Sequence, residues 1–217
     1  MPWLPRTRIA AALSVAAAVA ALGGTALAAP ASAATCTDIH VVFARGSGEA
    51  PGLGITGTPF VSAVQANAAG RSVSSYAVNY AAALDQSSAG AGATDMTNHV
   101  VQYAADCPNA RIVLGGYSQG ASVTDISIGI PTLLGVGRTI PTNLSSRISA
   151  VVVFGNPLRL SGQNINTASP TYGGRALDDC NIGDPVCAAG VNILAHLTYG
   201  TDGSAAAGGA FAAQRSR

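Results

Sequence analysis

Short, continuous apolar segments alternate along the chain with longer segments whose apolar residues recur at near-helical spacing. The short segments, which we expect to be strands, are Ile39–Ala44, Val73–Tyr80, Ile112–Leu114 and Ile148–Phe154. The longer segments, which we expect to be helices, are Phe60–Ala69, Gly92–Ala105, Ala121–Ile130, Val191–Tyr199 and Ala205–Gln214. Alternation of this kind is typical of a parallel sheet covered by helices on both faces. The pattern therefore predicts an α/β fold, with a long Gly-, Ser-, Asn- and Pro-rich loop from Gly155 to Gly174 of the kind that lines a site.

The first residues follow a different pattern. Arg6 and Arg8 precede an uncharged run rich in Ala, Leu and Val from Ile9 to Ala29, and Ala31-Ser32-Ala33 follows it. This order of basic, apolar and small residues is typical of a secretory signal peptide that is cleaved after Ala33. An uncleaved membrane anchor is the alternative, because the run approaches the length of a membrane span. Alanine is only weakly apolar, so we predict cleavage.

The predicted division is therefore a signal peptide at residues 1–33 and one domain at residues 34–217, long enough for a hydrophobic core. After cleavage we expect no stable insertion into a membrane. The chain contains 11 Arg, no Lys and 10 Asp or Glu, without a basic patch or charge run. Nucleic acid is therefore not an expected partner. So little charge suits an apolar or uncharged substrate, although an Ala- and Gly-rich composition would produce it as well.

The four cysteines of an exported chain suggest two disulfides, and three pairings are possible. Cys180 and Cys187 enclose six residues and would close one short loop. Cys36 and Cys107 would then join the mature N-terminus to the end of a helix. The sequence contains no C-x-x-C pair, so a structural zinc site is not expected.

The segment Gly116-Tyr117-Ser118-Gln119-Gly120 follows the predicted strand Ile112–Leu114 and precedes a predicted helix. It matches the G-x-S-x-G nucleophile elbow, in which a strained turn exposes the serine hydroxyl at the carboxyl end of the sheet. The motif alone is a weak signal in a chain with 26 glycines, but its setting between strand and helix strengthens it. We predict that Ser118 is a nucleophile.

A serine nucleophile needs a general base, and an acid that orients the base. In the α/β-hydrolase arrangement the acid and then the histidine follow the serine in the chain. The chain has 3 histidines, of which His40 and His99 precede Ser118 and only His196 follows it. A lone histidine is often purely structural, but no other residue can fill the role in this order. We therefore predict His196 as the base.

Four carboxylates lie between the serine and this histidine, and three of them are poor candidates for the acid. Asp125 is about two helical turns past the serine, so it should point away from the site. Asp178 and Asp179 directly precede Cys180, and we expect them to be solvated loop charges.

Asp184 is the remaining carboxylate, and it lies within the Cys180–Cys187 loop between a glycine and a proline. A disulfide around this loop would hold the carboxylate in one place. An orienting acid needs such a fixed position, because a mobile partner cannot hold the imidazole in one tautomer. We therefore predict Asp184 as the acid.

An oxyanion hole requires hydrogen-bond donors aimed at the tetrahedral intermediate. One donor should be the backbone N–H of Gln119, the residue after the nucleophile. The second should come from the loop after an early strand, and Arg45-Gly46-Ser47-Gly48-Glu49 ends the first strand. Ser47 could donate both its backbone N–H and its hydroxyl. A phosphate-binding loop is the alternative, but the chain lacks the lysine that such a loop requires.

Four segments together resemble the cutinase family. They are Phe43-Ala44-Arg45-Gly46-Ser47, Gly116-Tyr117-Ser118-Gln119-Gly120, the Cys180–Cys187 loop with Gly183-Asp184, and His196-Leu197. The resemblance extends from about Cys36 to Tyr199. It implies a small α/β-hydrolase, which is a three-layer α/β/α sandwich with a mainly parallel five-stranded sheet, and a site without a lid.

The resemblance also implies roles for particular residues. It implies a triad of Ser118, Asp184 and His196, oxyanion donors at Ser47 and Gln119, and disulfides Cys36–Cys107 and Cys180–Cys187. The secreted, Ala- and Arg-rich, lysine-free character resembles the actinobacterial cutinase-like branch more than the fungal plant-pathogen enzymes.

We therefore predict a secreted serine esterase, a carboxylic ester hydrolase that forms an acyl-enzyme and needs no metal or cofactor. Its substrate would be a small-molecule, lipid or polyester ester, and it would act as a monomer outside the cell or at the cell wall. A chain this short leaves little room for a large lid, which favours short- to medium-chain esters. Asn79, Tyr80 and the loop Leu177–Val191 are weaker candidates for the pocket wall, and ordinary packing explains them equally well.

Other functions remain open at this point. Acetylxylan esterase and phospholipase-like activities belong to the same family as the predicted esterase. A secreted surface or antigenic protein with little activity is an alternative of a different class, against which an intact triad argues.

Overall fold

The computed structural model describes residues 1–3 and 35–217. The predicted signal peptide therefore lies outside the described residues, apart from its first three. Within the described part of the chain, every helix is too short or too polar to cross a membrane. The predicted domain at residues 34–217 falls almost entirely within the described residues.

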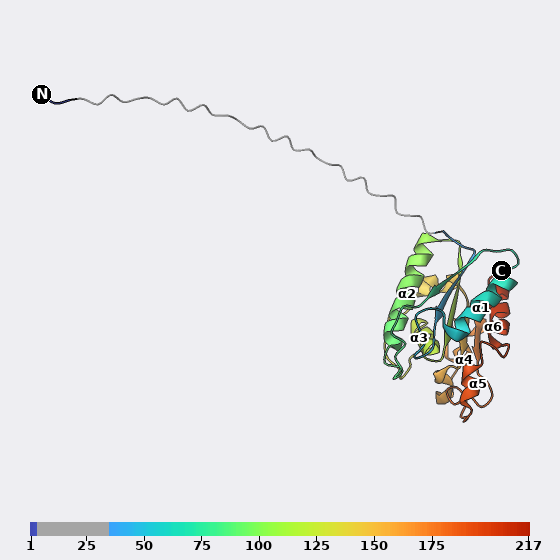
Figure 1. Ribbon diagram of the computed structural model, residues 1–217. Coiled ribbons are helices and arrows are strands. Elements are labelled where there is room, and N and C mark those ends of the chain that lie inside the picture. The colour runs from blue at the N-terminus through green and yellow to red at the C-terminus, as the bar shows by residue number, and fades with distance from the viewer. Residues whose placement is uncertain (4–34) are drawn as a thin grey trace. The chain divides into compact units, whose positions relative to one another are not determined.

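Five parallel strands form one sheet in the spatial order β2-β1-β3-β4-β5. β1 covers Ile39–Ala44, β2 Val73–Ala77, β3 Arg111–Tyr117, β4 Ile148–Phe154 and β5 Ala176–Asp179. The three central strands consist almost entirely of buried apolar residues, as expected for strands that are covered on both faces. Helices lie on both sides of the sheet (Figure 1), so the predicted three-layer α/β/α sandwich is confirmed.

The helices divide between the two faces of the sheet. α1 covers Gly54–Asn67, α2 Ala89–Asp106, α3 Gln119–Ser127, α4 Ile165–Ala168, α5 Ile193–Leu197 and α6 Ser204–Arg215. α2 packs against α3, and α1 packs against α6 on the other side of the sheet (Figure 1). Each helix pair covers a separate hydrophobic core. Met96 and Leu114 belong to the core on the α2/α3 face, and Phe60 and Phe154 belong to the core on the α1/α6 face.

α1 begins at Gly54, before Pro59, whereas the sequence pattern predicts a helix that starts after this proline. The carboxylate of Glu49 explains the earlier start, because its Oε1 accepts a 2.7 Å hydrogen bond from the Ile55 N–H in the first turn. First-turn N–H groups have no acceptor within the helix, and a carboxylate also interacts favourably with this end of the helix dipole. The loop that follows β1 is therefore fixed to the start of α1.

β5 has no counterpart among the predicted strands, because half of its residues are the carboxylates Asp178 and Asp179. It pairs with β4 at the edge of the sheet. The region predicted as a long loop, from Gly155 to Gly174, contains α4 and the 3₁₀ turn Pro157–Ser161, and a second 3₁₀ turn, Gly173–Arg175, begins at its end.

The carboxyl ends of the strands meet at one edge of the sheet, and the predicted site residues follow these ends. Ser47 comes after β1, Ser118 after β3 and Asp184 after β5. The disulfide Cys180–Cys187 closes the loop after β5. The second disulfide, Cys36–Cys107, joins the segment before β1 to the end of α2. The fold therefore gathers the predicted site from loops far apart in the sequence.

Candidate active site

Ser118 lies on the sharp turn between β3 and α3, with φ 56° and ψ −119°. Left-handed φ values are uncommon for residues other than glycine, so this turn is strained. Close contacts around this turn require glycine at positions 116 and 120. A Cβ on Gly116 would lie 2.0 Å from the Gly120 carbonyl oxygen, and a Cβ on Gly120 would lie 2.0 Å from that of Ala44. The strand and the helix can approach this closely only because both positions lack a side chain.

His196, in α5, places its Nε2 2.9 Å from the Ser118 hydroxyl oxygen. The hydroxyl of Tyr117 donates a 2.8 Å hydrogen bond to the His196 carbonyl, which fixes the backbone of this residue. The imidazole lies over Gly155, where a Cβ would come within 2.8 Å of Cε1. The ring is almost fully buried, so its position is set by packing as well as by hydrogen bonds.

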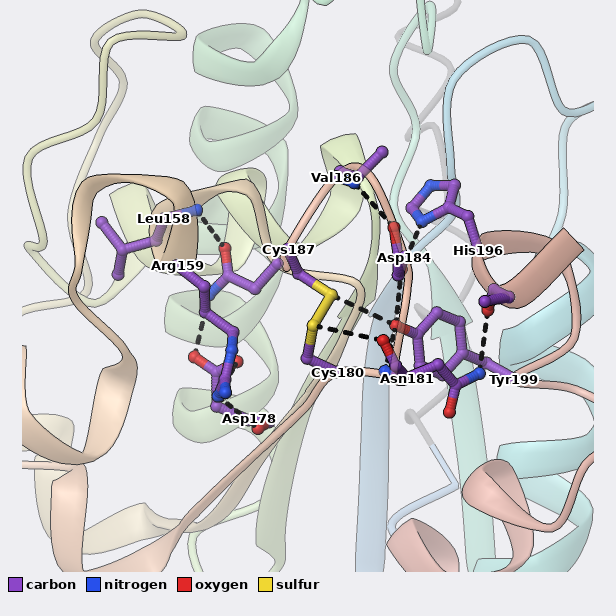
Figure 2. The surroundings of a disulfide bond; sticks show 12 residues. Leu158, Arg159, Asp178, Cys180, Asn181, Asp184, Val186, Cys187, His196 and Tyr199 are labelled. Atoms are coloured by element: carbon purple, nitrogen blue, oxygen red, sulfur yellow. Dashed lines mark hydrogen bonds and ion pairs between the residues drawn. A yellow bond between two sulfur atoms is a disulfide. The ribbon is translucent and has the colours of Figure 1, made fainter. Parts of the chain in front are cut away.

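Asp184 is completely buried and contacts the other ring nitrogen of His196. Its Oδ2 lies 2.8 Å from Nδ1, and its Oδ1 accepts a 2.7 Å hydrogen bond from the Val186 N–H (Figure 2). The Cys180–Cys187 disulfide closes the loop that carries this carboxylate. With Nδ1–H donated to Asp184, the Nε2 of His196 is free to accept the proton of Ser118.

Tyr199 is a further contact of Asp184 that the sequence analysis missed. Its hydroxyl donates a 2.6 Å hydrogen bond to Asp184 Oδ2 and accepts a 2.9 Å hydrogen bond from the Asn181 N–H. Burial, and then the hydrogen bond to Asp184, raise the pKa of the Tyr199 hydroxyl, so it stays protonated as a donor. The sequence shows that Tyr199 follows shortly after His196. No sequence motif, however, identifies a tyrosine that binds the carboxylate of Asp184.

The predicted oxyanion residues both lie at the carboxyl edge of the sheet, one after β1 and the other after β3. Ser47 is half-buried in the turn after β1, and Gln119 is the first residue of α3. The N–H of Gln119 has no acceptor within its helix, because it belongs to the first turn. Gly120 touches the carbonyls of Ala44 and Arg45, which brings the turn that carries Ser47 against the start of α3.

Arg45 and Glu49 hold the turn that carries Ser47 in place, and sequence reasoning did not identify this role. The guanidinium of Arg45 is buried and donates hydrogen bonds to the carbonyls of Glu49 at 2.8 Å, Tyr80 at 2.7 Å and Val78 at 3.3 Å. The Gly46 N–H donates a 2.5 Å hydrogen bond to the Glu49 carboxylate. The turn before and after Ser47 is therefore fixed by two charged side chains.

Tyr80 also belongs to this arrangement rather than to an open pocket wall. Its hydroxyl is buried and donates a 2.5 Å hydrogen bond to the Arg45 carbonyl, and the Arg45 guanidinium lies 5.0 Å from its ring centre. The neighbouring Asn79 is exposed, and its N–H donates to Asp95. Of the two interpretations given for Tyr80, the structure supports packing.

The prediction that Asp178 is a solvated loop charge is wrong. Its side chain is fully buried in β5 and lies 3.7 Å from the Arg159 guanidinium (Figure 2). Its Oδ2 accepts hydrogen bonds from the Ile165 N–H at 3.0 Å and from Asn156 at 3.1 Å. Asp125 is also buried and contacts the same Asn156 amide at 3.3 Å, rather than His196.

The other two histidines lie near the amino ends of the strands, away from this arrangement. His40, in β1, contacts His99, in α2, through their Nε2 atoms at 2.8 Å. The ring of His40 stacks on Tyr103, and the ring of His99 stacks on Tyr76. The pair is a packed structural cluster.

The fold, with a serine on a strained turn between a parallel strand and a helix, defines an α/β-hydrolase. Comparison with known proteins narrows this class, because the Cutinase family model matches residues 35–215. The cutinase of Kineococcus radiotolerans is 54% identical over 183 residues, which cover 83% of this chain and 62% of that protein. The phospholipase Culp4 of Mycobacterium tuberculosis is 45% identical over 176 residues, which cover 80% of this chain and 76% of that protein.

A solved structure gives the same result. The cutinase of Trichoderma reesei in complex with a phosphonate inhibitor has a TM-score of 0.66 and 28% sequence identity, covering 84% of this chain and 78% of that one. The chain therefore belongs to the cutinase family, as its motifs indicated. It spans about three fifths of the length of the first curated relatives it matches.

Proposed function

We propose that the protein is a secreted serine esterase that hydrolyses carboxylic esters through Ser118, His196 and Asp184. The observation that carries the proposal is the continuous contact from the Ser118 hydroxyl to His196 at 2.9 Å and from His196 to Asp184 at 2.8 Å. The strained turn that exposes the serine and the cutinase relatives support the same reaction class.

In the acylation step, Ser118 Oγ attacks the ester carbonyl carbon while His196 Nε2 takes the hydroxyl proton. Asp184 holds the ring in the correct tautomer and stabilises the imidazolium. The carbonyl oxygen becomes an oxyanion, for which Ser47 and the Gln119 N–H would be the donors. When the carbonyl re-forms, the alcohol leaves with the proton from His196, and the acyl group stays on Ser118.

In the second step, water attacks the acyl carbon while His196 accepts its proton. Collapse of this intermediate releases the carboxylic acid and returns the proton to Ser118. The chemistry that we propose needs only the side chains and backbone N–H groups named above.

The proposal includes export of the chain. Residues 1–33 would serve as the signal peptide and residues 34–217 as the mature enzyme, acting as a monomer outside the cell. The two disulfides suit an oxidising compartment.

Phospholipase activity is the second candidate, because one relative at 45% identity carries that name. The reaction at Ser118 would be the same, with a glycerol ester as the substrate. Release of fatty acid from phosphatidylcholine vesicles would favour this candidate if it exceeded the release from soluble esters.

The test is hydrolysis of p-nitrophenyl esters from acetate to palmitate by protein purified from culture medium, with Ser118→Ala as the control. We expect turnover that depends on Ser118. A folded, disulfide-intact protein that neither turns over any ester nor reacts with an organophosphate at Ser118 would overturn the proposal and favour a non-catalytic surface protein.

A further inference from the structure

Tyr117 is the last residue of β3 and directly precedes Ser118 in the chain. Its side chain is 4% exposed and belongs to the hydrophobic core on the α1/α6 face of the sheet. A tyrosine in such a core is stable only when its hydroxyl has a hydrogen-bond partner. Here the partner belongs to the candidate active site rather than to the core.

The partner is the carbonyl of His196, which accepts a 2.8 Å hydrogen bond from the Tyr117 hydroxyl. The two rings also lie close together, with their centroids 5.0 Å apart. Burial, and then the negative charges of Glu49 and Asp184, raise the pKa of the Tyr117 hydroxyl above its ordinary 10, so the hydroxyl stays a donor at neutral pH. α5 has only 5 residues and is too short to be stable alone, so its position depends on contacts of this kind.

The same tyrosine ring contacts the turn that carries Ser47. A Cβ on Gly46 would lie 2.7 Å from both Cδ1 and Cε1 of Tyr117, which is much closer than two unbonded carbon atoms can approach. The φ of Gly46 is not positive, so the ring contact, rather than the backbone conformation, requires glycine here. The turn before Ser47 therefore packs directly against the ring of Tyr117.

Tyr117 thus contacts two separate parts of the proposed mechanism, and it is also the chain neighbour of a third, Ser118. Its hydroxyl holds the backbone of His196, and its ring supports the turn before Ser47. We propose that Tyr117 is a positioning residue that couples this turn to His196, so that the ring transmits a displacement of one to the other. The coupling keeps the base and the oxyanion donor at fixed positions relative to Ser118.

This inference rests on the proposed esterase activity, because it gives a buried residue a task within that reaction. The task requires no contact with the substrate, so we expect an effect on kcat rather than on KM. A slightly displaced base still allows the ester to bind, but it takes the proton of Ser118 less efficiently.

Two substitutions test the two contacts separately. Tyr117→Phe removes the hydroxyl that binds the His196 carbonyl and keeps the ring against Gly46. Gly46→Ala keeps the hydroxyl and places a methyl group 2.7 Å from the ring, so that the ring or the turn must move. Tyr103→Phe is the matched control, because Tyr103 is also buried and its hydroxyl accepts a 3.2 Å hydrogen bond from the Thr37 N–H, before the start of β1.

The measurements are kcat and KM for p-nitrophenyl butyrate and the unfolding temperature of the disulfide-intact protein. We expect Tyr117→Phe to lower kcat about tenfold and Gly46→Ala to lower it about fivefold, with KM within about twofold of wild type in both. Tyr103→Phe should lose thermal stability and keep the wild-type kcat.

The double variant Tyr117→Phe/Gly46→Ala tests the coupling itself. It should be no slower than Tyr117→Phe alone, because a ring that is no longer bound to His196 can yield to the methyl group. If the turn and His196 were positioned independently, the two losses would multiply, and the double variant would be about fifty times slower than wild type. That result would overturn the inference.

Two further results would also overturn it. Wild-type kcat in Tyr117→Phe, or an equal loss of kcat in Tyr103→Phe, would show that Tyr117 contributes to stability alone. Should Tyr117→Phe not fold, wild-type kcat in folded Gly46→Ala would contradict the inference. If the wild-type protein hydrolysed no ester, the esterase proposal itself would fail, and this inference with it.

Discussion

The hydroxyl of Tyr199 donates a 2.6 Å hydrogen bond to Oδ2 of Asp184, the same carboxylate oxygen that contacts His196. Together with the Val186 N–H on Oδ1, this contact fixes the carboxylate in a fully buried position. A buried carboxylate is stable only when its oxygens are hydrogen-bonded. Tyr199 therefore both stabilises the charge and sets the direction from which Asp184 meets the imidazole.

Replacing Tyr199 with Phe should lower kcat about tenfold with little change in KM. The reason is the loss of one hydrogen bond to a charged group, worth about 1.5–3 kcal/mol, from a residue that orients His196. The measurement is steady-state hydrolysis of p-nitrophenyl butyrate, with Tyr172→Phe as a control at a buried tyrosine in the core on the opposite face of the sheet. An unchanged kcat in Tyr199→Phe would show that the loop alone positions Asp184.

Ser47→Ala should lower kcat by about 10²-fold while the thermal unfolding temperature stays near that of the wild type. A change of this size is expected when one oxyanion donor is lost. The substitution removes only the hydroxyl, so it also tests whether the side chain, rather than the backbone N–H, binds the oxyanion. If kcat does not change, the Ser47 hydroxyl has no part in the mechanism.

Arg45→Lys should lower kcat about tenfold, although the side chain need not touch the substrate. Lysine keeps the charge but cannot reproduce the planar fork that donates to three carbonyls around the turn of Ser47. We expect kcat to fall and KM to stay similar, because a displaced donor weakens binding of the transition state. The assay temperature must lie well below the unfolding temperature of the variant.

The control for this experiment is Arg147→Lys. The Arg147 guanidinium also donates to carbonyls, those of Cys107 and Ala110, but at the other end of β3. Both variants should lose thermal stability. Equal kcat values for the two would show that Arg45 contributes to stability alone.

Asp125→Asn should stabilise the protein more at pH 8 than at pH 4. Burial, and then the charge of Asp178, raise the pKa of Asp125 well above its ordinary 3.8. The folded state thus holds this proton more tightly than the unfolded chain, so stability from this group is complete below pH 3.8 and decreases as pH rises through the folded value. Asparagine cannot ionise, and it keeps an oxygen to accept from Asn156.

The measurement is the difference in unfolding temperature between variant and wild type across this pH range. Asp106→Asn, which removes a carboxylate at an exposed position, is the control. If the difference in unfolding temperature for Asp125→Asn does not change with pH, ionisation of Asp125 does not destabilise the folded protein at neutral pH.

His99→Gln should reduce the loss of stability on acidification from pH 7 to pH 4. Burial, and then the neighbouring His99, lower the pKa of His40 to about 4, and burial lowers that of His99. Since these values lie below the ordinary 6.5, the stability from the pair is present above pH 6.5 and is lost as pH falls toward 4. Chemical denaturation at several pH values measures this, and an identical slope in variant and wild type would contradict it.

The strained serine turn could be predicted from the sequence because its requirements are local. Gly116 and Gly120 are each within two residues of Ser118, and a Cβ at either position would lie 2.0 Å from a neighbouring carbonyl oxygen. That distance leaves no space for a side chain, so the glycines mark the turn. The order of Asp184 and His196 after the serine could also be predicted, because the fold fixes the order in which strand ends reach the site.

The surroundings of these residues could not be predicted in the same way. Tyr199 forms a hydrogen bond with Asp184 in the disulfide loop, and Arg45 forms one with Tyr80, 35 residues further along the chain. No sequence spacing predicts either contact, because each contact depends on how two loops pack. Asp178 was misjudged for the same reason, since its buried partners Ile165 and Asn156 come from other segments.

By itself the sequence determined the alternation of strands and helices, the strained serine turn and the chain order of the predicted site residues. Only the tertiary structure decided that the polar segment Ala176–Asp179 is a strand, that Asp178 is buried, and that an apolar cavity lies beside Ser122. Periodicity and turn chemistry depend on residues a few positions apart. The burial of polar groups and the shape of a cavity depend on segments that meet only when the whole chain has packed.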